Sequence, residues 1–207
     1  MVLHMKSQRN LLYAGVAALP WFTFWVVLLD VLRPEYDYRY KAVSELGVLG
    51  APHMVWMNVL GFVGTGLLLA AFALGYKSLK SPRSPGYLPL LVTALLFMGT
   101  AIPGQMTEGL DPDPNYTSTI TIIHLFFSLT SFIAWLIAHF SIIRHAAKPL
   151  RRLSAITMLV VVGLFVASAS GALSGMPGLV QRINFGIFLG WYAIAALLLL
   201  KTTRRDA

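Results

Sequence analysis

The sequence contains no cysteine among its 207 residues. Disulfide bonds, thiolate nucleophiles and cysteine-based zinc sites are therefore excluded. No HExxH or comparable metal-binding motif is present either, so a divalent metal ion is only weakly supported as a cofactor. His53 and His124 are the two nitrogen ligands that such a site would use. A haem held by the same two histidines is the weakest possibility, because no second pair is placed to carry electrons across a membrane.

Charge is also scarce. Only 12% of the residues are charged, whereas 57% are hydrophobic, and about a quarter of the residues are charged in a soluble domain. The composition therefore excludes an ordinary soluble protein and predicts a protein that is surrounded by a lipid bilayer. The net charge of +8 could indicate a nucleic-acid partner, but the way the charge is distributed favours a membrane. We expect no nucleic acid, and protein partners stay open.

Six apolar runs dominate the chain. A bilayer core about 30 Å thick needs about 20 helical residues to cross it. The runs cover residues 11–32, 54–76, 87–102, 118–143, 153–173 and 178–200. The first run is too long for the hydrophobic region of a signal peptide, and no A-x-A cleavage site follows it. The sequence predicts an all-α polytopic membrane protein, a single domain over residues 1–207 that forms a bundle of six transmembrane helices.

The basic residues predict the orientation of this bundle. Twelve of the sixteen Lys and Arg residues fall in the two terminal tails and in the second and fourth connections between the runs. Basic loops stay in the cytoplasm, so we expect both termini to be cytoplasmic. An even number of helices also requires both termini on one side. Seven of the eight acidic residues lie at or beyond the opposite, outer ends of the runs.

Three of those acids share the loop between the third and fourth runs. Glu108, Asp111 and Asp113 stand in the sequence TEGLDPDPNY. The two prolines force turns and stiffen the backbone. One interpretation is a solvated turn, for which Asp-Pro is common chemistry. The other is that Asp111 and Asp113 cap a polar site that includes His124, which follows a few residues later.

His124 lies in a polar stripe on the fourth run. Spacings of three and four residues place the members of the stripe on one helical face. They are Thr117, Thr121, His124, Ser128, Ser131 and Trp135. A polar face toward lipid is costly, so we expect the stripe to face the inside of the bundle. His124 is then either a structural histidine bonded to a neighbouring helix or a functional group, since ionisable residues inside membranes usually have a role.

Arg182 is the second unusual residue, because it lies at the outer end of the sixth run, against the trend of the other basic residues. We expect it to pair with a carboxylate or with a lipid phosphate. The carboxylates available for this are Glu45, Asp111 and Asp113. The alternative is an arginine that only extends to the membrane surface.

The first outer connection combines two patterns. Tyr36, Tyr38 and Tyr40 alternate with charged residues, which predicts an extended segment with its aromatic rings on one face. The following sequence, VSELGVLGAP, is short and mostly apolar. It could fold back against the bundle and carry Ser44 and Glu45 inward.

Two further features concern packing. Asn58, in the outer part of the second run, adds a group that can both donate and accept hydrogen bonds. Gly186 and Gly190 form a small-xxx-small pair on the sixth run, a pattern that lets helices approach each other closely.

Several of these motifs resemble a known family. They are SELG after the first run, Asn58 with Gly61 in the second, the Pro/Asp-rich loop that leads to HLFFSL, and GLVQRI at the start of the last run. The chain resembles, over nearly its whole length, the prokaryotic six-helix membrane proteins catalogued as domain of unknown function 998. The resemblance implies a six-helix fold in a prokaryotic cytoplasmic membrane, and it brings no established reaction or ligand. The family positions that it implies are Ser44, Asp111, His124, Ser128 and Arg182.

The leading functional hypothesis is a membrane-embedded hydrolase or transferase that acts on a lipid-like substrate. Its catalytic residues would be His124, Asp111, Asp113 and Glu45, and its ligand-binding residues Arg182, Ser44, Asn58 and Ser128. The alternative is a non-catalytic protein that binds a lipid or small ligand, or a subunit of a membrane complex. A transporter ranks third, because the inner half of the bundle offers few polar groups beyond His139 and Thr157.

Overall fold

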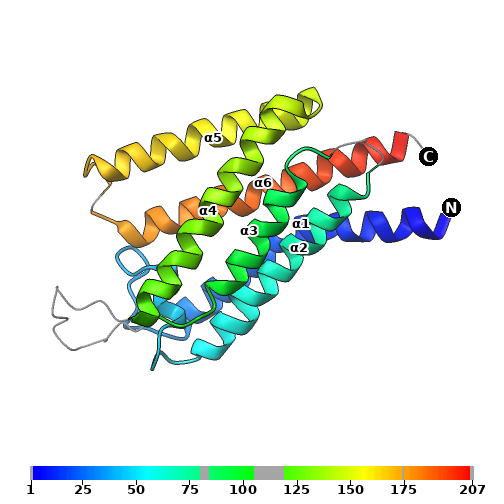
Figure 1. The fold of residues 1–207 in the computed structure, drawn as a ribbon. Helices are drawn as coiled ribbons and strands as arrows, with labels where there is room; N and C mark the ends of the chain where they lie inside the picture. The colour runs from blue at the N-terminus through cyan, green and yellow to red at the C-terminus, as the bar shows by residue number, and fades with distance from the viewer. Residues whose placement is uncertain (1, 80–83, 105–118, 174, 206–207) are drawn as a thin grey trace.

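The fold consists of helices, as the sequence predicts. The computed structural model describes residues 2–79, 84–104, 119–173 and 175–205, and no strand occurs in these ranges. Its six α-helices (Figure 1) are α1 (Val2–Val31), α2 (Gly64–Lys77), α3 (Tyr87–Gly99), α4 (Thr119–His145), α5 (Lys148–Ala169) and α6 (Pro177–Arg205). Two short elements lie before α2, the 3₁₀ helix η1 (Val43–Gly47) and the π-helix η2 (Trp56–Val63). Because η2 continues directly into α2, the two form one rod.

Five helical segments are long and apolar enough to cross a membrane: α1, the rod of η2 and α2, α4, α5 and α6. The exception is α3, whose 13 residues rise only about 20 Å, less than the roughly 30 Å of a hydrocarbon core. The helices also extend beyond the apolar runs, since α1 begins at Val2 and α5 at Lys148. An apolar run identifies only the part of a helix that lies in the hydrocarbon core, and the same helix continues through polar residues beyond that core. This set of helices is that of an integral membrane protein.

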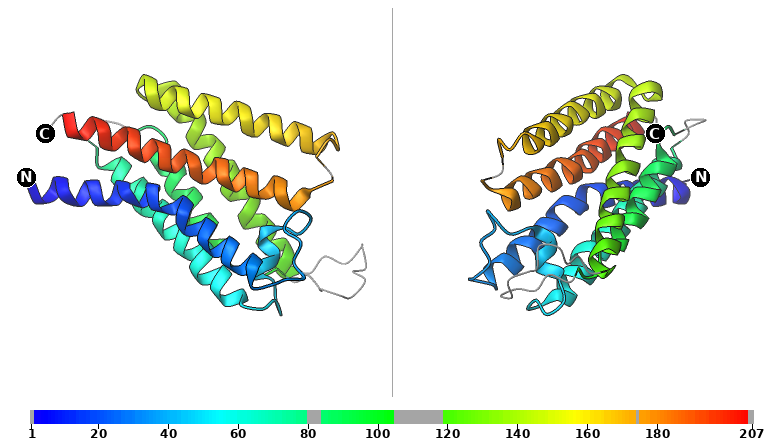
Figure 2. Two further views of the ribbon diagram at one scale, coloured as in Figure 1. Left: turned by 180° about the vertical axis from the view of Figure 1, so that it is seen from behind. Right: turned by 60° about the vertical axis from the view of Figure 1, so that its left-hand side comes forward.

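The helices pack mainly against their neighbours in sequence. α1 packs on α2 and α6, α2 on α3, and α3 on α4, whereas α5 packs only on α4 and α6 within the described ranges. No Cα atom of α4 lies within 8 Å of a Cα atom of α6. The backbones of these two helices therefore do not pack closely against each other, and α4 and α6 meet only through side chains. α1 contains Pro20 and bends partway along its length (Figure 2), as expected when a proline removes a helical hydrogen bond.

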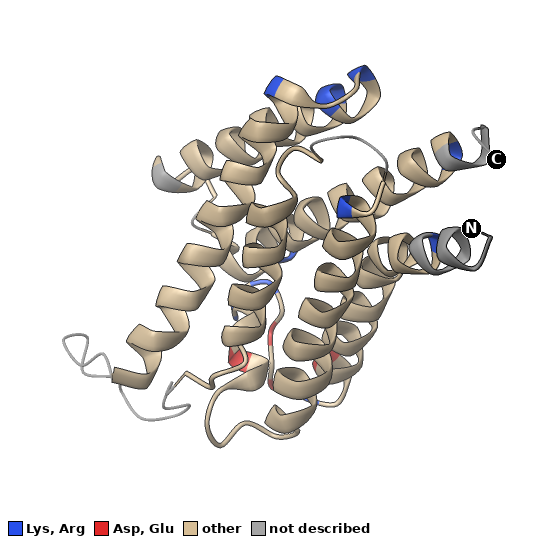
Figure 3. Cartoon of the chain, turned by 45° about the vertical axis from the view of Figure 1, so that its right-hand side comes forward, with Lys and Arg blue, Asp and Glu red and all other residues tan. Residues whose placement is uncertain are grey.

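The two ends of the bundle differ in charge. Both termini lie at one end with the α4–α5 connection, and we call this the terminal end; the opposite end, where α1 ends and α6 begins, is the loop end (Figure 1). Lys and Arg gather at the terminal end, and the described acids lie at the loop end (Figure 3). Those acids are Asp30, Glu35, Asp37 and Glu45.

Close helix contacts occur at glycines other than the predicted pair. A Cβ atom added at Gly75 would lie 3.0 Å from the backbone nitrogen of Leu12, and one at Gly66 would lie 3.0 Å from the carbonyl oxygen of Ala94. These glycines bring α2 close to α1 and to α3. The predicted packing role of Gly186 and Gly190 is wrong in this structure, because no described atom would come within 4 Å of a Cβ atom at either position.

Candidate functional site

Arg182 links α1, the first loop and α6 at the loop end by hydrogen bonds. Its Nη2 atom donates to both carboxylate oxygens of Asp30 in α1, at 2.9 and 3.1 Å, and to the hydroxyl of Tyr36 at 3.2 Å. Its Nη1 atom donates to the carbonyls of Tyr38 and Lys41 at 2.9 and 3.0 Å, and to that of Gly178 at 3.2 Å. The predicted pairing with an outer acid is present, but the acid is Asp30 and not Glu45. Both terminal nitrogens of Arg182 are thus already bonded within the chain.

The start of α6 holds the same loop by its backbone. The Leu179 N–H donates to the carbonyl of Arg39 at 3.1 Å, and the Val43 N–H donates to Oε1 of Gln181 at 2.5 Å. The first N–H groups of a helix have no partner inside the helix, so the loop carbonyl satisfies one of them. Gly178 lies so close to the loop that a Cβ atom there would be 2.6 Å from the carbonyl oxygen of Tyr38. The motif GLVQRI therefore anchors the first loop to α6.

The three alternating tyrosines do not share a face, and the extended segment predicted for them is wrong. Residues 34–41 form turns, in which Tyr36 is buried while Tyr38 and Tyr40 are exposed. The Tyr36 hydroxyl donates to the carbonyl of Ala42 and accepts from Arg182. Burial raises the pKa of the Tyr36 phenol to about 12, although Arg182 opposes this effect, so the hydroxyl remains a donor at neutral pH. Hydrogen bonds to the backbone, rather than period-two alternation, decide how this segment folds.

Ser44 and Glu45 lie in η1, which folds back against the bundle as the sequence suggested. The Glu45 carboxylate accepts from the Ala42 N–H at 2.7 Å, and the Ala42 carbonyl accepts from the Glu45 N–H at 3.0 Å. Glu45 therefore caps its own short helix. The buried side chain of Asn58, in η2, donates to the carbonyl of Gly47 at 2.8 Å and so ties η2 to the end of η1.

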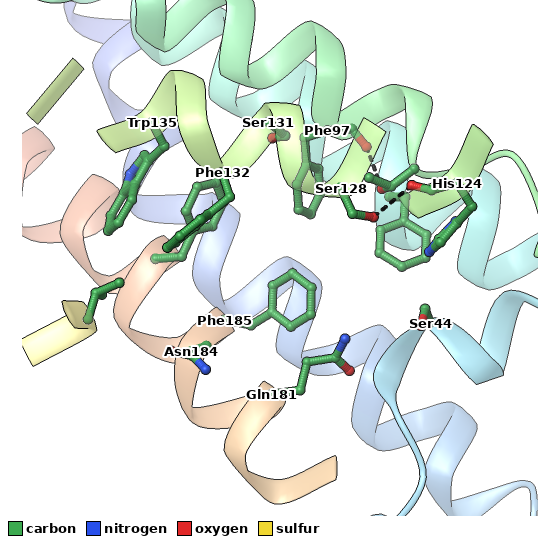
Figure 4. A pocket seen from close by; sticks show the side chains of 14 residues that line it. Ser44, Phe97, His124, Ser128, Ser131, Phe132, Trp135, Gln181, Asn184 and Phe185 are labelled. Carbon is green, nitrogen blue, oxygen red and sulfur yellow. Dashed lines mark hydrogen bonds between the residues drawn. The ribbon is translucent and has the colours of Figure 1, made fainter. Parts of the chain in front are cut away.

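Ser44 faces a cavity of about 180 Å³ between η1, α4 and α6. Polar and aromatic side chains are interspersed around it, with His124 and Ser44 toward one end and Phe132 and Trp135 toward the other (Figure 4). The polar group consists of Ser44, Thr100, His124, Ser128, Ser131, Gln181 and Asn184, and the apolar group of Phe62, Phe97, Phe132, Trp135, Val161, Phe185 and Phe188. The predicted stripe on α4 faces this cavity with His124, Ser128, Ser131 and Trp135.

His124 is held in one orientation on the cavity wall. Its side chain is 8% exposed, and its Nδ1 atom lies 3.0 Å from the carbonyl oxygen of Ile102. A carbonyl oxygen only accepts hydrogen bonds, so Nδ1 must carry the proton, and Nε2 of the neutral ring is then an acceptor. The Phe62 ring lies edge-on to the imidazole, with centroids 6.4 Å apart.

Two hydroxyls of the stripe are used within the bundle. Ser128 Oγ donates to the carbonyl of His124 at 3.0 Å, one turn back along α4. Ser131 Oγ donates to the carbonyl of Thr93 at 3.1 Å and so joins α4 to α3. Ser128 does not bond the imidazole, and the described residues therefore contain no serine–histidine pair of the kind that activates a nucleophile.

Four polar groups on the cavity keep unused hydrogen-bonding capacity. The Ser44 hydroxyl, the His124 Nε2 atom, the Gln181 amide nitrogen and the Asn184 side chain have no hydrogen-bond partner among the described residues. Such groups are costly inside a membrane unless water or a ligand meets them. Gln181 and Asn184 were not singled out from the sequence; their spacing of three residues on α6 placed them on one face, but nothing indicated that this face meets the stripe of α4.

Some predicted residues are not placed at this cavity. His53 is exposed, stacks on Trp56 with ring centroids 4.7 Å apart, and does not line the cavity with His124. No group of three or more metal-binding side chains occurs among the described residues. Asp111 and Asp113 lie outside the described residues, so the proposed cap over His124 stays a prediction.

Comparison with known proteins supports the family assignment. A family model described as "Protein of unknown function (DUF998)" matches residues 16–198. No match was found among curated proteins or among solved structures. Because the family model covers most of the sequence, the chain belongs to the DUF998 family.

Proposed function

We propose that this protein binds one uncharged, lipid-like amphiphile in the cavity between α4 and α6. The observation that carries the proposal is a cavity whose wall combines polar groups that have unused hydrogen-bonding capacity with several aromatic rings. The polar head of an amphiphile could bond Ser44 and His124 at one end, while its chain lies against Phe132 and Trp135 at the other. Convergent polar groups in an otherwise apolar pocket are typical of ligand sites.

The lining favours an uncharged head over a phosphate. No Lys, Arg, Asp or Glu of the described residues lines the cavity. Arg182 already bonds Asp30 and the first loop, and Glu45 caps η1. Neutral hydroxyl, ester or amide groups can bond serine, amide and imidazole side chains without a buried counter-charge.

The volume of the cavity limits how much of an amphiphile it can enclose. A cavity of about 180 Å³ is smaller than the roughly 300 Å³ or more of sites that enclose a whole drug-sized ligand. It therefore suits the head and the first part of a chain.

Monoolein, which has a neutral hydroxylated head and one acyl chain, is a suitable probe. Native mass spectrometry of the detergent-solubilised protein should show one bound monoolein, and the Ser128→Leu variant, which fills the cavity, should lose it. Thr130→Leu is the matched control, because Thr130 also donates to a carbonyl four residues back in α4 but does not line the cavity. Equal binding by wild type and Ser128→Leu, or equal loss in both variants, would contradict the proposal.

A hydrolase or transferase is the second candidate, and the orientation of His124 favours it. With Nδ1 bonded to a carbonyl, Nε2 can take a proton from water or a hydroxyl group inside the cavity, as a general base does. That proton could come from a water molecule or from the hydroxyl of Ser44, which lines the same cavity.

Product analysis separates this candidate from simple binding. An enzyme should release oleate from monoolein, and His124→Gln should abolish the release while the variant still binds monoolein. If monoolein stays intact after prolonged incubation with the wild type, the protein binds esters of this kind but does not hydrolyse them. Oleate release by His124→Gln at the wild-type rate would exclude His124 as the base.

A further inference from the structure

A second cavity lies at the terminal end, far from the first. It has a volume of about 370 Å³ and is formed by the end of α2, the α4–α5 connection and the end of α6. No described residue lines both cavities. The proposal for it is therefore independent of the function proposed for the first cavity.

The lining of this second cavity has a polar and an apolar part. The polar part contains Ser84, His145, Lys201 and Thr202, and the apolar part contains Leu79, Leu150, Leu198 and Leu199. The leucines of α6 adjoin the exposed apolar surface of the same helix, where Ile194 is 48% and Leu197 55% exposed. An apolar surface thus continues from the cavity to the part of α6 that faces lipid.

Positive charge lies at this cavity, and no described acid lies near it. Lys201 lines it and has no ion-pair partner among the described residues. Other basic side chains of the terminal end stand nearby in the chain, and every described acid lies at the loop end (Figure 3). The basic residues of the terminal end whose side chains the structure describes are Arg9, Lys77, Arg144, Lys148, Arg151, Arg152 and Lys201. The preference of basic loops for one side of a membrane explains their presence, but it requires no cavity among them.

We propose that this cavity binds the phosphate-bearing head of an anionic phospholipid, with Lys201 as the principal cation. A phosphate diester would pair with Lys201, and the acyl chains would lie along the leucines and the exposed face of α6. Basic pockets between transmembrane helices recognise anionic lipid heads in this way. The apolar wall favours a lipid over free phosphate, because a free anion would gain nothing from the four leucines.

Lipid titration of the full chain in detergent tests this proposal, with binding measured by native mass spectrometry. Phosphatidylglycerol should bind more tightly than phosphatidylcholine or inorganic phosphate. Lys201→Gln should weaken phosphatidylglycerol binding about fivefold, and Lys201→Arg should preserve it. The matched control is Lys77→Gln, which removes one charge from the same end. The Lys77 Nζ atom lies 4.9 Å from the Tyr87 ring centroid, and the residue does not line the cavity.

Three results would overturn the proposal. Equal weakening in Lys77→Gln and Lys201→Gln would show that only the general surface charge attracts the lipid. Equal affinity for phosphatidylglycerol and phosphatidylcholine would show that the charge of the head is not recognised. Binding of inorganic phosphate as tightly as phosphatidylglycerol would assign the cavity to a free anion instead of a lipid.

Discussion

Arg182 joins three parts of the chain that are far apart in sequence. Asp30 ends the first helix, Tyr36 to Lys41 form the first loop, and Arg182 itself lies in α6. The side chains of Arg182 and Asp30 are only 15% and 18% exposed. Removing one partner of such a buried ion pair leaves the other charge unpaired. This lowers stability by more than the net stabilisation that the pair contributes.

We therefore expect Arg182→Ala to lower the free energy of unfolding by about 2–4 kcal/mol. The measurement is thermal unfolding in detergent, together with urea or guanidinium titration where it is reversible. Arg39→Ala is the control, because the Arg39–Asp37 pair is exposed at 52% and 38% and exposed pairs contribute about 1 kcal/mol or less. If Arg182→Ala and Arg39→Ala unfold alike, the bonds of Arg182 do not hold the loop in solution.

The sequence identified Arg182 as unusual but not its partner. The position of an arginine at the acidic end of the chain is visible in the order of residues alone. Asp30 was visible too, at the outer end of the first run. Its pairing with Arg182 depends on α1 lying beside α6, and no periodicity within either helix contains that information.

At the scale of elements, the contact between the first loop and α6 depends on a residue without a side chain. A Cβ atom at Gly178 would overlap the carbonyl oxygen of Lys41 and lie 2.6 Å from that of Tyr38. Both are backbone atoms, which cannot turn aside as a flexible side chain can. The loop and the start of α6 therefore fit together only with glycine at this position.

Gly178→Ala should lower the free energy of unfolding by about 1–3 kcal/mol, the usual cost of inserting atoms into a packed contact. Limited proteolysis should also cut the first loop faster, because the loop is displaced. Gly186→Ala is the control within the same helix, where no described atom lies within 4 Å of the added carbon. It should be neutral or stabilising by up to about 1 kcal/mol. Equal stability of the two variants would contradict the tight contact at Gly178.

The long helices were predictable from the sequence, and the short elements were not. Apolar length alone identified α1, α4, α5 and α6, and the rod of η2 and α2. The turns around Tyr36, the 3₁₀ helix and the π-helix arise from contacts with other parts of the chain. Asn58 bonds the carbonyl of Gly47, and Trp21 donates to the carbonyl of Leu60 within η2 at 2.7 Å. Interactions of this kind compete with regular helical hydrogen bonds and leave no periodic signal.

The sequence predicted the α4 side of the cavity but not the α6 side. Spacings of three and four residues gave the α4 face that carries His124, Ser128 and Ser131. The opposite wall, with Gln181 and Asn184, comes from α6, and only the packing of the whole molecule brings the two together. The functional hypothesis from the sequence rested on Asp111 and Asp113, the loop acids that precede His124. The described part of the cavity contains no carboxylate.

At the scale of the whole molecule, the segregation of charge leads us to propose that the terminal end is cytoplasmic. The absence of cysteine makes this testable without background labelling. Ala147→Cys, in the α4–α5 connection, and Ala172→Cys, in the α5–α6 connection, replace exposed alanines at opposite ends. A membrane-impermeant maleimide should label position 172 in intact cells and position 147 only after permeabilisation. The reverse pattern would show that the orientation is inverted.

The segregated charges also respond to the voltage across an energised membrane. If the terminal end faces a negative interior, the seven Lys and Arg residues there whose side chains are described lie on the side of favourable electrical potential. An inverted molecule would have to carry each of them to the positive side, at about 2.3 kcal/mol per charge for every 100 mV. The four described acids of the loop end would move the other way, but Arg33, Arg39, Lys41 and Arg182 beside them would offset that cost. The resting potential of the cell would thus help to keep this bundle in the orientation in which it was inserted.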